Sequence, residues 1–168
     1  MEVKFTDGEA GASSQNPSWD ASSPFQRPTA NTWRSADNPQ PAIFIWYEFK
    51  RQHQPAKISF MVPQAGHFGG CGAWPDCIPS KFEFIGTNDA TCNQDSNWST
   101  LCKRQYGEFD SNQLQIQMKK PLGCQVDRNQ LCQEEKFRCL GLKILTYGLR
   151  NRGLYTTLTK IQMWEIVE

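Results

Sequence analysis

Short apolar runs separated by turn residues recur along the whole chain. The run AIFIWYEFK at 42–50 is apolar at nearly every position, as in a strand that is covered on both faces. In 111–120, Leu114, Ile116 and Met118 alternate with glutamines, which predicts a strand with one wet face. Further runs predict strands at 57–62, 81–87, 136–147 and 156–168. No window of the sequence shows a sustained helical period, so the pattern predicts an all-β protein built as a β-sandwich.

Long polar stretches separate several of these runs. Residues 13–41 are rich in Ser, Asn and Pro, and the aromatic residues spaced through them indicate a loop that is packed on a core. Residues 63–80 combine Gly, Pro and Cys in a loop of a length that tends to be functional in compact domains. Residues 82–102 begin as a strand and then turn polar between two cysteines. This last stretch is compatible with a strand and hairpin, a metal knuckle or a ligand-binding loop.

Size and charge narrow the class of protein. The chain has 168 residues, and we expect one domain over 1–168. It carries 18 Lys and Arg against 17 Asp and Glu, so it lacks the positive excess of a nucleic-acid binder or a polybasic membrane-surface protein. No apolar stretch is long enough to predict a transmembrane segment. Residues 1–15 hold no apolar core of signal-peptide length, which leaves a cytoplasmic protein and the mature form of a secreted protein as alternatives.

Seven cysteines add candidate cross-links. No spacing is C-x-x-C, and two histidines offer few ligands for a mixed Cys/His zinc site. Local disulfides are the more natural hypothesis, because Cys71–Cys77 and Cys92–Cys102 would each close a short polar loop. The candidates for disulfide bonding are Cys71, Cys77, Cys92, Cys102, Cys124 and Cys132. In a reducing cytoplasm the same residues would remain small, often buried thiols.

Several short motifs follow one another in a characteristic order. They are A-S-S-Q at 12–15, T-W-R-S at 32–35, W-Y-E-F at 46–49, F-I-G-T-N-D at 84–89 followed by Trp98, and F-R-x-L-x-L at 137–142. In this order they resemble the discoidin family, also called coagulation factor V/VIII type C domains, over nearly the whole chain. The resemblance implies a jelly-roll β-sandwich of the galactose-binding-like type, with its core over 10–167 and a lead-in over 1–9. It also implies that 82–102 is a strand and a lengthened hairpin whose Trp98 folds back onto the sandwich.

One loop departs from the family pattern. Many discoidin domains hold a structural calcium ion near an Asn-Ala-Phe-Asp-Gly segment, where this chain reads S-P-F-Q-R-P at 23–28. Gln26 replaces the acidic residue and Arg27 replaces the glycine. Calcium prefers six to eight oxygen ligands and gains affinity from carboxylates. We therefore expect calcium binding to be weakened here, with the backbone carbonyls of Thr29 and Asn31 as the remaining ligands.

The resemblance implies that ligands bind to loops at one end of the sandwich, here 22–31, 63–80 and 148–155. A sugar site needs an aromatic face and planar hydrogen-bonding groups for neighbouring hydroxyls, which arginine supplies well. The candidate ligand contacts are Arg27, His67, Trp74, Asp76, Arg150 and Arg152. An alternative stays open for Trp74, whose ring would equally well pack against its own loop instead of a ligand. His53, which lies in a charged connection, is expected to be solvated.

The expected function is that of a non-enzymatic recognition module for a glycan or a cell-surface ligand. A protein–protein interaction or adhesion module is the alternative, and binding to anionic phospholipid through apolar loop tips such as Phe68 is less favoured by the near-neutral charge. Catalysis is not expected, because a pair of His67 with Cys71 or Cys77 has no obvious orienting group or oxyanion hole. An extracellular location is favoured over the cytoplasm.

Overall fold

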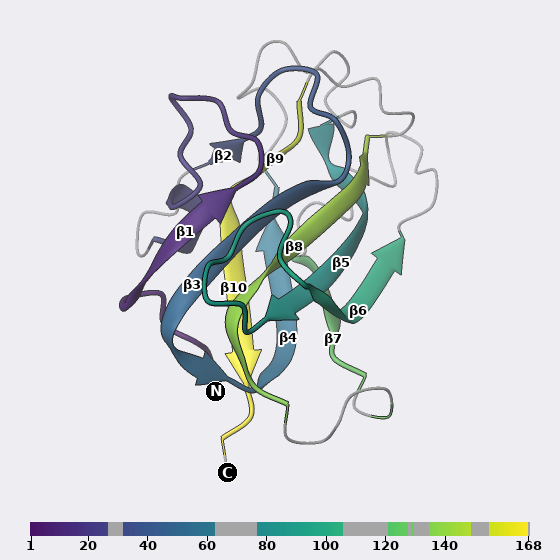
Figure 1. Cartoon of the computed structure of the whole chain (residues 1–168). Coiled ribbons are helices and arrows are strands. Elements are labelled where there is room, and N and C mark those ends of the chain that lie inside the picture. Colours follow the sequence, from purple (N-terminus) through teal and green to yellow (C-terminus); the bar gives the residue numbers. More distant parts are fainter. Residues whose placement is uncertain are drawn as a thin grey trace.

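The computed structural model of the chain describes residues 1–26, 32–62, 77–105, 121–127, 129, 135–148 and 155–167. These residues form strands and one short 3-10 helix (Figure 1). The elements are β1 (Gly8–Ala12), η1 (Ser23–Phe25), β2 (Trp33–Arg34), β3 (Ile43–His53), β4 (Pro55–Met61), β5 (Pro79–Thr87), β6 (Ser99–Gln105), β7 (Leu122–Gln125), β8 (Phe137–Tyr147), β9 (Thr157–Leu158) and β10 (Lys160–Glu165). Within the described ranges no helix is both long and apolar enough to cross a membrane.

The strands form two layers (Figure 1). One layer is a five-stranded sheet in the order β1-β3-β8-β5-β6, and the other is a three-stranded sheet in the order β10-β4-β7. The short strands β2 and β9 form a separate pair, and every pairing is antiparallel. The predicted all-β sandwich is therefore confirmed.

The core lies between the two sheets. Alternating side chains of β5 and β8 point into it, among them Phe82, Phe84 and Leu142, all fully buried. Phe60 of β4 meets Phe82 edge to face at 5.0 Å between ring centroids, which joins the layers directly. Trp33, one of the aromatic residues of the stretch that was expected to pack on a core, is also fully buried. Burial of such aromatic side chains contributes on the order of 2–3 kcal/mol each.

Most of the predicted strands are present. The run at 42–50 forms β3, and the runs at 57–62, 81–87 and 136–147 form β4, β5 and β8 with small differences at their ends. The run at 156–168 is divided into β9 and β10 at Thr159. The strand predicted at 111–120 lies outside the described residues. Within 1–9, Val3 donates its backbone N–H to the carbonyl of Met163 at 2.8 Å, so this segment lies along β10.

The disulfides differ from the predicted local pairs. Cys92 is bonded to Cys139 and Cys102 to Cys124, so the predicted Cys92–Cys102 bond is wrong. The reason is the alternation of β6, which turns Cys102 toward the same side as its neighbour Phe84 and hence toward β7. Cys77 is also disulfide-bonded. Its predicted partner Cys71, like Cys132, lies outside the described residues.

His53 is not solvated as expected. Its side chain is 3% exposed and its Nδ1 lies 2.7 Å from a carboxylate oxygen of Glu165, at the far end of the chain. The ring also packs on Phe49, with 4.3 Å between centroids. His53 is thus buried although it lies in a charged stretch of the sequence. Its contact with Glu165 ties the end of β3 to the end of β10.

Candidate functional site

None of the predicted ligand contacts falls within the described residues. These positions are Arg27, His67, Trp74, Asp76, Arg150 and Arg152, together with the predicted calcium carbonyls of Thr29 and Asn31. The structure does describe where the three predicted ligand loops leave the sandwich and return to it. The site is therefore built from these loop ends.

The ends of the predicted loops lie together. Gly148, where β8 ends, donates its backbone N–H to the carbonyl of Ile78 at 2.7 Å. Thr156 donates its hydroxyl to the carbonyl of Cys77 at 2.9 Å. The backbone N–H of Thr156 also donates to the hydroxyl of Ser35 at 3.0 Å. These bonds connect residues at an end of each predicted loop, so these described loop ends lie together at one end of the sandwich.

We call this group of flanking residues the loop-base cluster. It consists of Trp33, Arg34, Ser35, Cys77, Ile78, Gly148, Tyr155, Thr156 and Thr157.

The pair of β2 and β9 holds the cluster in place. Trp33 lies opposite Leu158 and Arg34 opposite Thr157 in this pairing. The hydroxyl of Thr157 donates to the carbonyl of Trp33 at 2.7 Å. The buried hydroxyls of Thr156 and Thr157 thus have partners, and each such bond contributes about 1 kcal/mol. Short strands that a propensity argument would miss are stabilised here by side-chain bonds to the backbone.

Gly148 marks the point at which β8 turns into the third predicted loop. Its φ of 68° lies in the left-handed region that favours glycine. A residue with a Cβ would strain the backbone at this turn.

Arg34 is the charged group of the cluster that the sequence prediction missed. Its guanidinium lies 3.6 Å from the centroid of the Tyr155 ring. Its Nη2 donates to a carboxylate oxygen of Asp37 at 2.7 Å, and the side chain is 17% exposed. Its Nε is buried and has no hydrogen-bond partner. A planar guanidinium fixed in this way resembles the groups that bind neighbouring oxygens of a ligand.

Tyr155 is fully buried beneath this guanidinium. Burial raises the pKa of its phenol, and the positive charge of Arg34 acts in the opposite direction. The phenol therefore stays neutral at physiological pH. It presents an uncharged ring to the guanidinium of Arg34 at the end of the third predicted loop.

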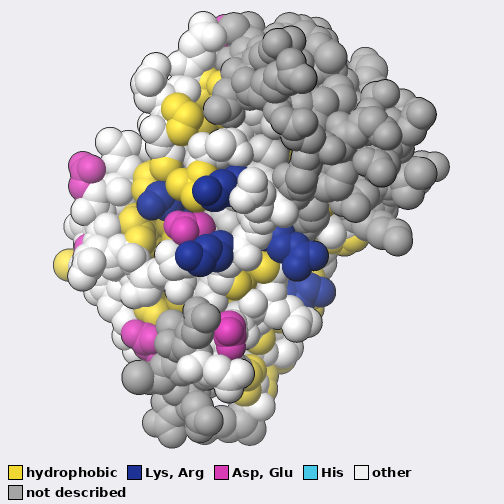
Figure 2. Space-filling view, turned by 90° about the vertical axis from the view of Figure 1, so that its right-hand side faces the viewer, with side chains coloured by type: hydrophobic (Ala, Val, Ile, Leu, Met, Phe, Trp, Pro, Cys, Tyr) yellow, Lys and Arg dark blue, Asp and Glu magenta, His cyan; other side chains and the backbone are white. Residues whose placement is uncertain are grey.

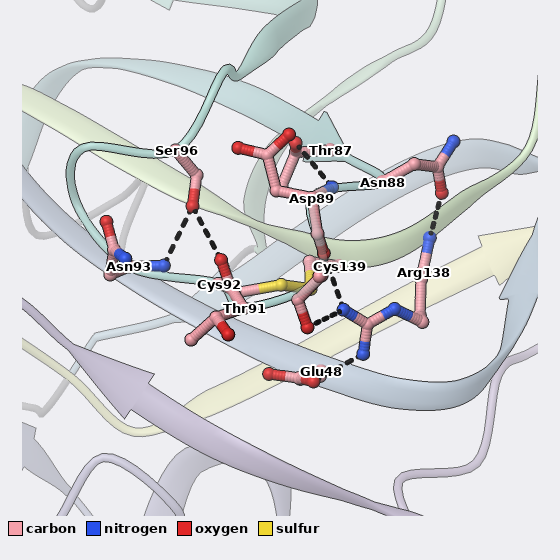
Figure 3. A network of polar contacts seen from close by, with 11 residues as sticks. Glu48, Thr87, Asn88, Asp89, Thr91, Cys92, Asn93, Ser96, Arg138 and Cys139 are labelled. Carbon is pink, nitrogen blue, oxygen red and sulfur yellow. Dashed lines mark hydrogen bonds and ion pairs between the residues drawn. A yellow bond between two sulfur atoms is a disulfide. The ribbon is translucent and has the colours of Figure 1, made fainter.

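The hairpin at 88–98 belongs to the scaffold (Figure 3). Arg138 of β8 donates to the Glu48 carboxylate and to the carbonyls of Asp89 and Ala90, the last at 2.7 Å. The backbone N–H of Arg138 donates to the side chain of Asn88 at 2.8 Å. The Cys92–Cys139 disulfide fixes the same hairpin to β8.

Trp98 packs back onto the sandwich as expected, but outside the main core. It lies beside Phe44 and Trp46 on the outer face of the five-stranded sheet, with 6.3 Å between ring centroids in each pair. Its indole N–H donates to the carbonyl of Asn93 at 3.0 Å. The polar stretch that raised three alternatives in the sequence is thus a packed, cross-linked hairpin.

One possible metal group among the described residues does not fit an ion. Glu48, Cys92 and Cys139 lie close together, but the two sulfur atoms are bonded to each other and offer no thiolate. In the first loop, the Gln26 amide donates to the hydroxyl of Ser22 at 3.2 Å. This position supplies no carboxylate for calcium, and the predicted carbonyls of Thr29 and Asn31 lie outside the described residues, so the weakened calcium binding stays a prediction.

Solved structures with the same fold are numerous, although no family model and no curated protein sequence matches the chain. A family 32 CBM (carbohydrate-binding module) from Clostridium perfringens NanJ, solved with galactose, has a TM-score of 0.65 at 10% identity and covers 98% of both chains. A chitosan-binding module from a Paenibacillus chitosanase/glucanase, solved with chitotriose, has a TM-score of 0.63 at 11% identity, covering 96% of this chain and 99% of the other. A SusE-like protein has a TM-score of 0.74 at 11% identity, covering 98% and 99%. The likeness shows that the chain is a β-sandwich of the galactose-binding-like type.

Proposed function

We propose that this protein is a non-enzymatic glycan-binding module, with its ligand site on the loops above the loop-base cluster. The observation that carries this proposal is the convergence of the flanks of three loops on one hydrogen-bonded base. Rigid elements that present several loops at one end are a common way to build a binding site. Two structures of the same fold, a family 32 CBM in complex with galactose and a chitosan-binding module in complex with chitotriose, support the choice of ligand.

The predicted contacts supply the chemistry that such a ligand needs. His67, Trp74 and Asp76 come from the second loop, and Arg150 and Arg152 from the third. An indole ring packs on the apolar face of a sugar, and the charged groups bind its hydroxyls. Arg34 stands at the base of these loops as a further donor.

A recognition role is favoured over catalysis. The titratable side chains described at the loop base are Arg34, Asp37 and Tyr155. Arg34 and Asp37 form an ion pair, and the Tyr155 phenol has a raised pKa. Nucleophilic catalysis would instead need a side chain such as Ser, Cys or Lys beside a general base.

The cross-links favour an extracellular location, and the order of the motifs favours a relationship to discoidin domains. The bonds Cys92–Cys139 and Cys102–Cys124, and the bonded Cys77, are typical of an oxidising compartment. The motif order at 32–35, 46–49 and 84–89 agrees with a discoidin-like member of the galactose-binding-like sandwiches.

A glycan array tests the proposal, followed by calorimetric titration of the strongest ligand. We expect selective binding, and Trp74→Ala should weaken it at least about tenfold because the apolar sugar face loses its partner. Arg51→Ala, which changes a side chain that is 67% exposed and lies beside Glu165 at the end of β10, is the control and should bind normally. A blank array, with binding to a protein ligand or to phosphatidylserine vesicles instead, would reject the glycan proposal.

A further inference from the structure

Two sheet edges lie side by side on one flank of the sandwich. β6 is the edge strand of the five-stranded sheet and β7 is an edge strand of the three-stranded sheet. The Cys102–Cys124 disulfide joins them, with 6.2 Å between the Cα atoms. The cross-link fixes the spacing of two edges that no backbone ladder connects.

A groove of about 700 Å³ runs along this pair of edges. Its lining is largely polar, with the disulfide at its base, and we call it the edge groove. The side chains that matter for recognition are Lys57, Ser59, Lys103, Arg104, Gln125 and Asp127. The volume is in the range of sites that bind small ligands.

The edge groove carries an excess of positive charge. Among the described lining residues, Lys57, Lys103 and Arg104 outnumber the one carboxylate, that of Asp127. Figure 2, which looks onto this side of the molecule, shows several Lys and Arg side chains on it, with an acidic side chain between some of them.

The charges of Lys57 and Lys103 are not neutralised by the described residues around them. Lys103 forms no ion pair with any described residue, and Lys57 lies 4.8 Å from the Trp164 ring centroid, a contact that leaves its charge intact. Glu83, which lies opposite Lys103 in the β5–β6 pairing, is instead 3.8 Å from the ammonium of Lys143.

The groove starts near the loop end of the sandwich. In the β5–β6 pairing Lys81 lies opposite Gln105, and in the β5–β8 pairing Pro79 lies opposite Tyr147. The end of β6 therefore lies at the same end of the five-stranded sheet as Ile78 and Gly148 of the loop-base cluster. From there the groove follows β6 back toward Thr100.

We propose that the edge groove binds an acidic segment of a glycan, through carboxylate or sulfate groups. The ammonium groups of Lys57 and Lys103 fit such anions, and Gln125 offers hydrogen bonds for sugar hydroxyls. The choice of a glycan rests on the proposed function, but the groove is a site distinct from the loops. It gives the module a preference for acidic polysaccharides over neutral ones.

Titration with defined oligosaccharides tests this site. The probes are tetragalacturonate, its fully methyl-esterified form and a heparin hexasaccharide, at about 50 mM and about 500 mM salt. We expect the acidic probes to bind at low salt, the ester to bind at least about tenfold more weakly, and high salt to reduce the difference. Preference for tetragalacturonate identifies carboxylate as the ligand group, and preference for heparin identifies sulfate.

Matched charge variants locate the binding. Lys57→Gln/Lys103→Gln should weaken the acidic probes about tenfold. Lys50→Gln/Lys136→Gln removes the same charge from exposed positions elsewhere and should leave the affinity within about twofold. Circular dichroism melts of both variants establish that they are folded.

The outcomes separate the edge groove from the loop site. Equal losses in the two double variants, or equal affinity for the acid and its ester, would overturn the groove proposal. If Trp74→Ala abolishes binding of the acidic probes and the groove variant does not, the loop site stands and the groove proposal fails. If no neutral glycan binds but the groove variant loses the acidic probes, the groove stands and the loop site fails.

Discussion

The guanidinium carbon of Arg34 lies 3.6 Å from the centroid of the Tyr155 ring. Arg34 belongs to β2, and Tyr155 stands where the chain returns from the third predicted ligand loop. The contact therefore connects the flank of the first loop with the flank of the third. Partly desolvated contacts of this kind contribute about 1–2 kcal/mol, so the pair is expected to stabilise the base of the binding site.

Arg34→Ala should destabilise the protein and weaken glycan binding. Loss of the stacking and of the Asp37 ion pair is expected to lower Tm by about 2–6 °C for a chain of this size. Arg34→Lys keeps the charge but not the planar stacking, so its Tm and its affinity should fall between those of the wild type and Arg34→Ala. Calorimetry and glycan titration measure both effects. Unchanged Tm and affinity in Arg34→Ala would show that the contact has no part in the site.

Arg138→Met should destabilise the hairpin at 88–98 without affecting glycan binding. The substitution leaves the Glu48 carboxylate and the carbonyls of Asp89 and Ala90 without their donor. The expected loss is about 2–3 kcal/mol in the free energy of unfolding, measured by urea titration. Arg138→Lys should recover only part of it, because one ammonium cannot replace the forked guanidinium. Loss of glycan binding in a folded Arg138→Met protein would mean that the hairpin belongs to the site.

The disulfide pairing is open to a direct chemical test. Proteolysis without reduction, followed by mass spectrometry, should yield peptides that join Cys92 to Cys139 and Cys102 to Cys124. Removal of either pair by alanine should cost about 2–5 kcal/mol of stability. The Cys92–Cys139 bond spans 47 residues and the Cys102–Cys124 bond spans 22. Because longer loops lose more entropy on closure, we expect the first removal to cost about 0.7 kcal/mol more. A peptide joining Cys92 to Cys102 would contradict this pairing.

Alkaline pH should destabilise the fold through its buried phenols. Burial raises the pKa of Tyr147 above its ordinary value of 10.0, and burial likewise raises the pKa values of Tyr47 and Tyr155. In the unfolded chain these phenols lose their protons near pH 10, while the folded chain still holds them. Since the unfolded state then binds fewer protons, the free energy of unfolding falls as pH rises above about 10.

Tyr147→Phe isolates this effect. The loss of stability between about pH 8 and about pH 10.5, measured by urea unfolding, should be smaller in the variant than in the wild type. Lysine titration is common to both proteins and cancels in the comparison. An equal or larger loss in Tyr147→Phe would contradict the raised pKa of this phenol.

Glycan affinity should be the same in calcium and in EDTA. Gln26 stands where discoidin-like sequences carry an acidic residue, and its amide bonds to the Ser22 hydroxyl. Parallel titrations with calcium and with EDTA measure the effect. A loss of affinity in EDTA that added calcium restores would show that other oxygen atoms of this chain hold the ion.

The strands that could be predicted from the sequence are those formed by nearly continuous apolar runs. In β3, Ile43, Ile45 and Phe49 are buried and belong to one apolar run, so a local pattern was sufficient. β6 gave no such signal. It is an edge strand whose second half is Lys103, Arg104 and Gln105, all exposed, and its pairing depends on β5.

Features that depend on distant partners could not be predicted from local patterns. His53 is buried because Glu165 lies beside it in the fold, although 112 residues separate them in the sequence. The Cys92–Cys139 bond depends in the same way on the hairpin folding over β8. The role of Arg34 requires the pairing of β2 with β9, which contain two residues each. The predicted ligand contacts, from Arg27 to Arg152, stay predictions.

The location of the ligand site is the central claim, and amide chemical shifts on titration with a glycan test it most directly. With galactose or chitotriose added to labelled protein, we expect the largest shifts of described residues at Ser35, Ile78 and Thr156 of the loop-base cluster. The amides of Asn88, Asn93 and Trp98 should not move. Shifts concentrated on that hairpin, or none at saturating sugar, would contradict a glycan site at the loop end.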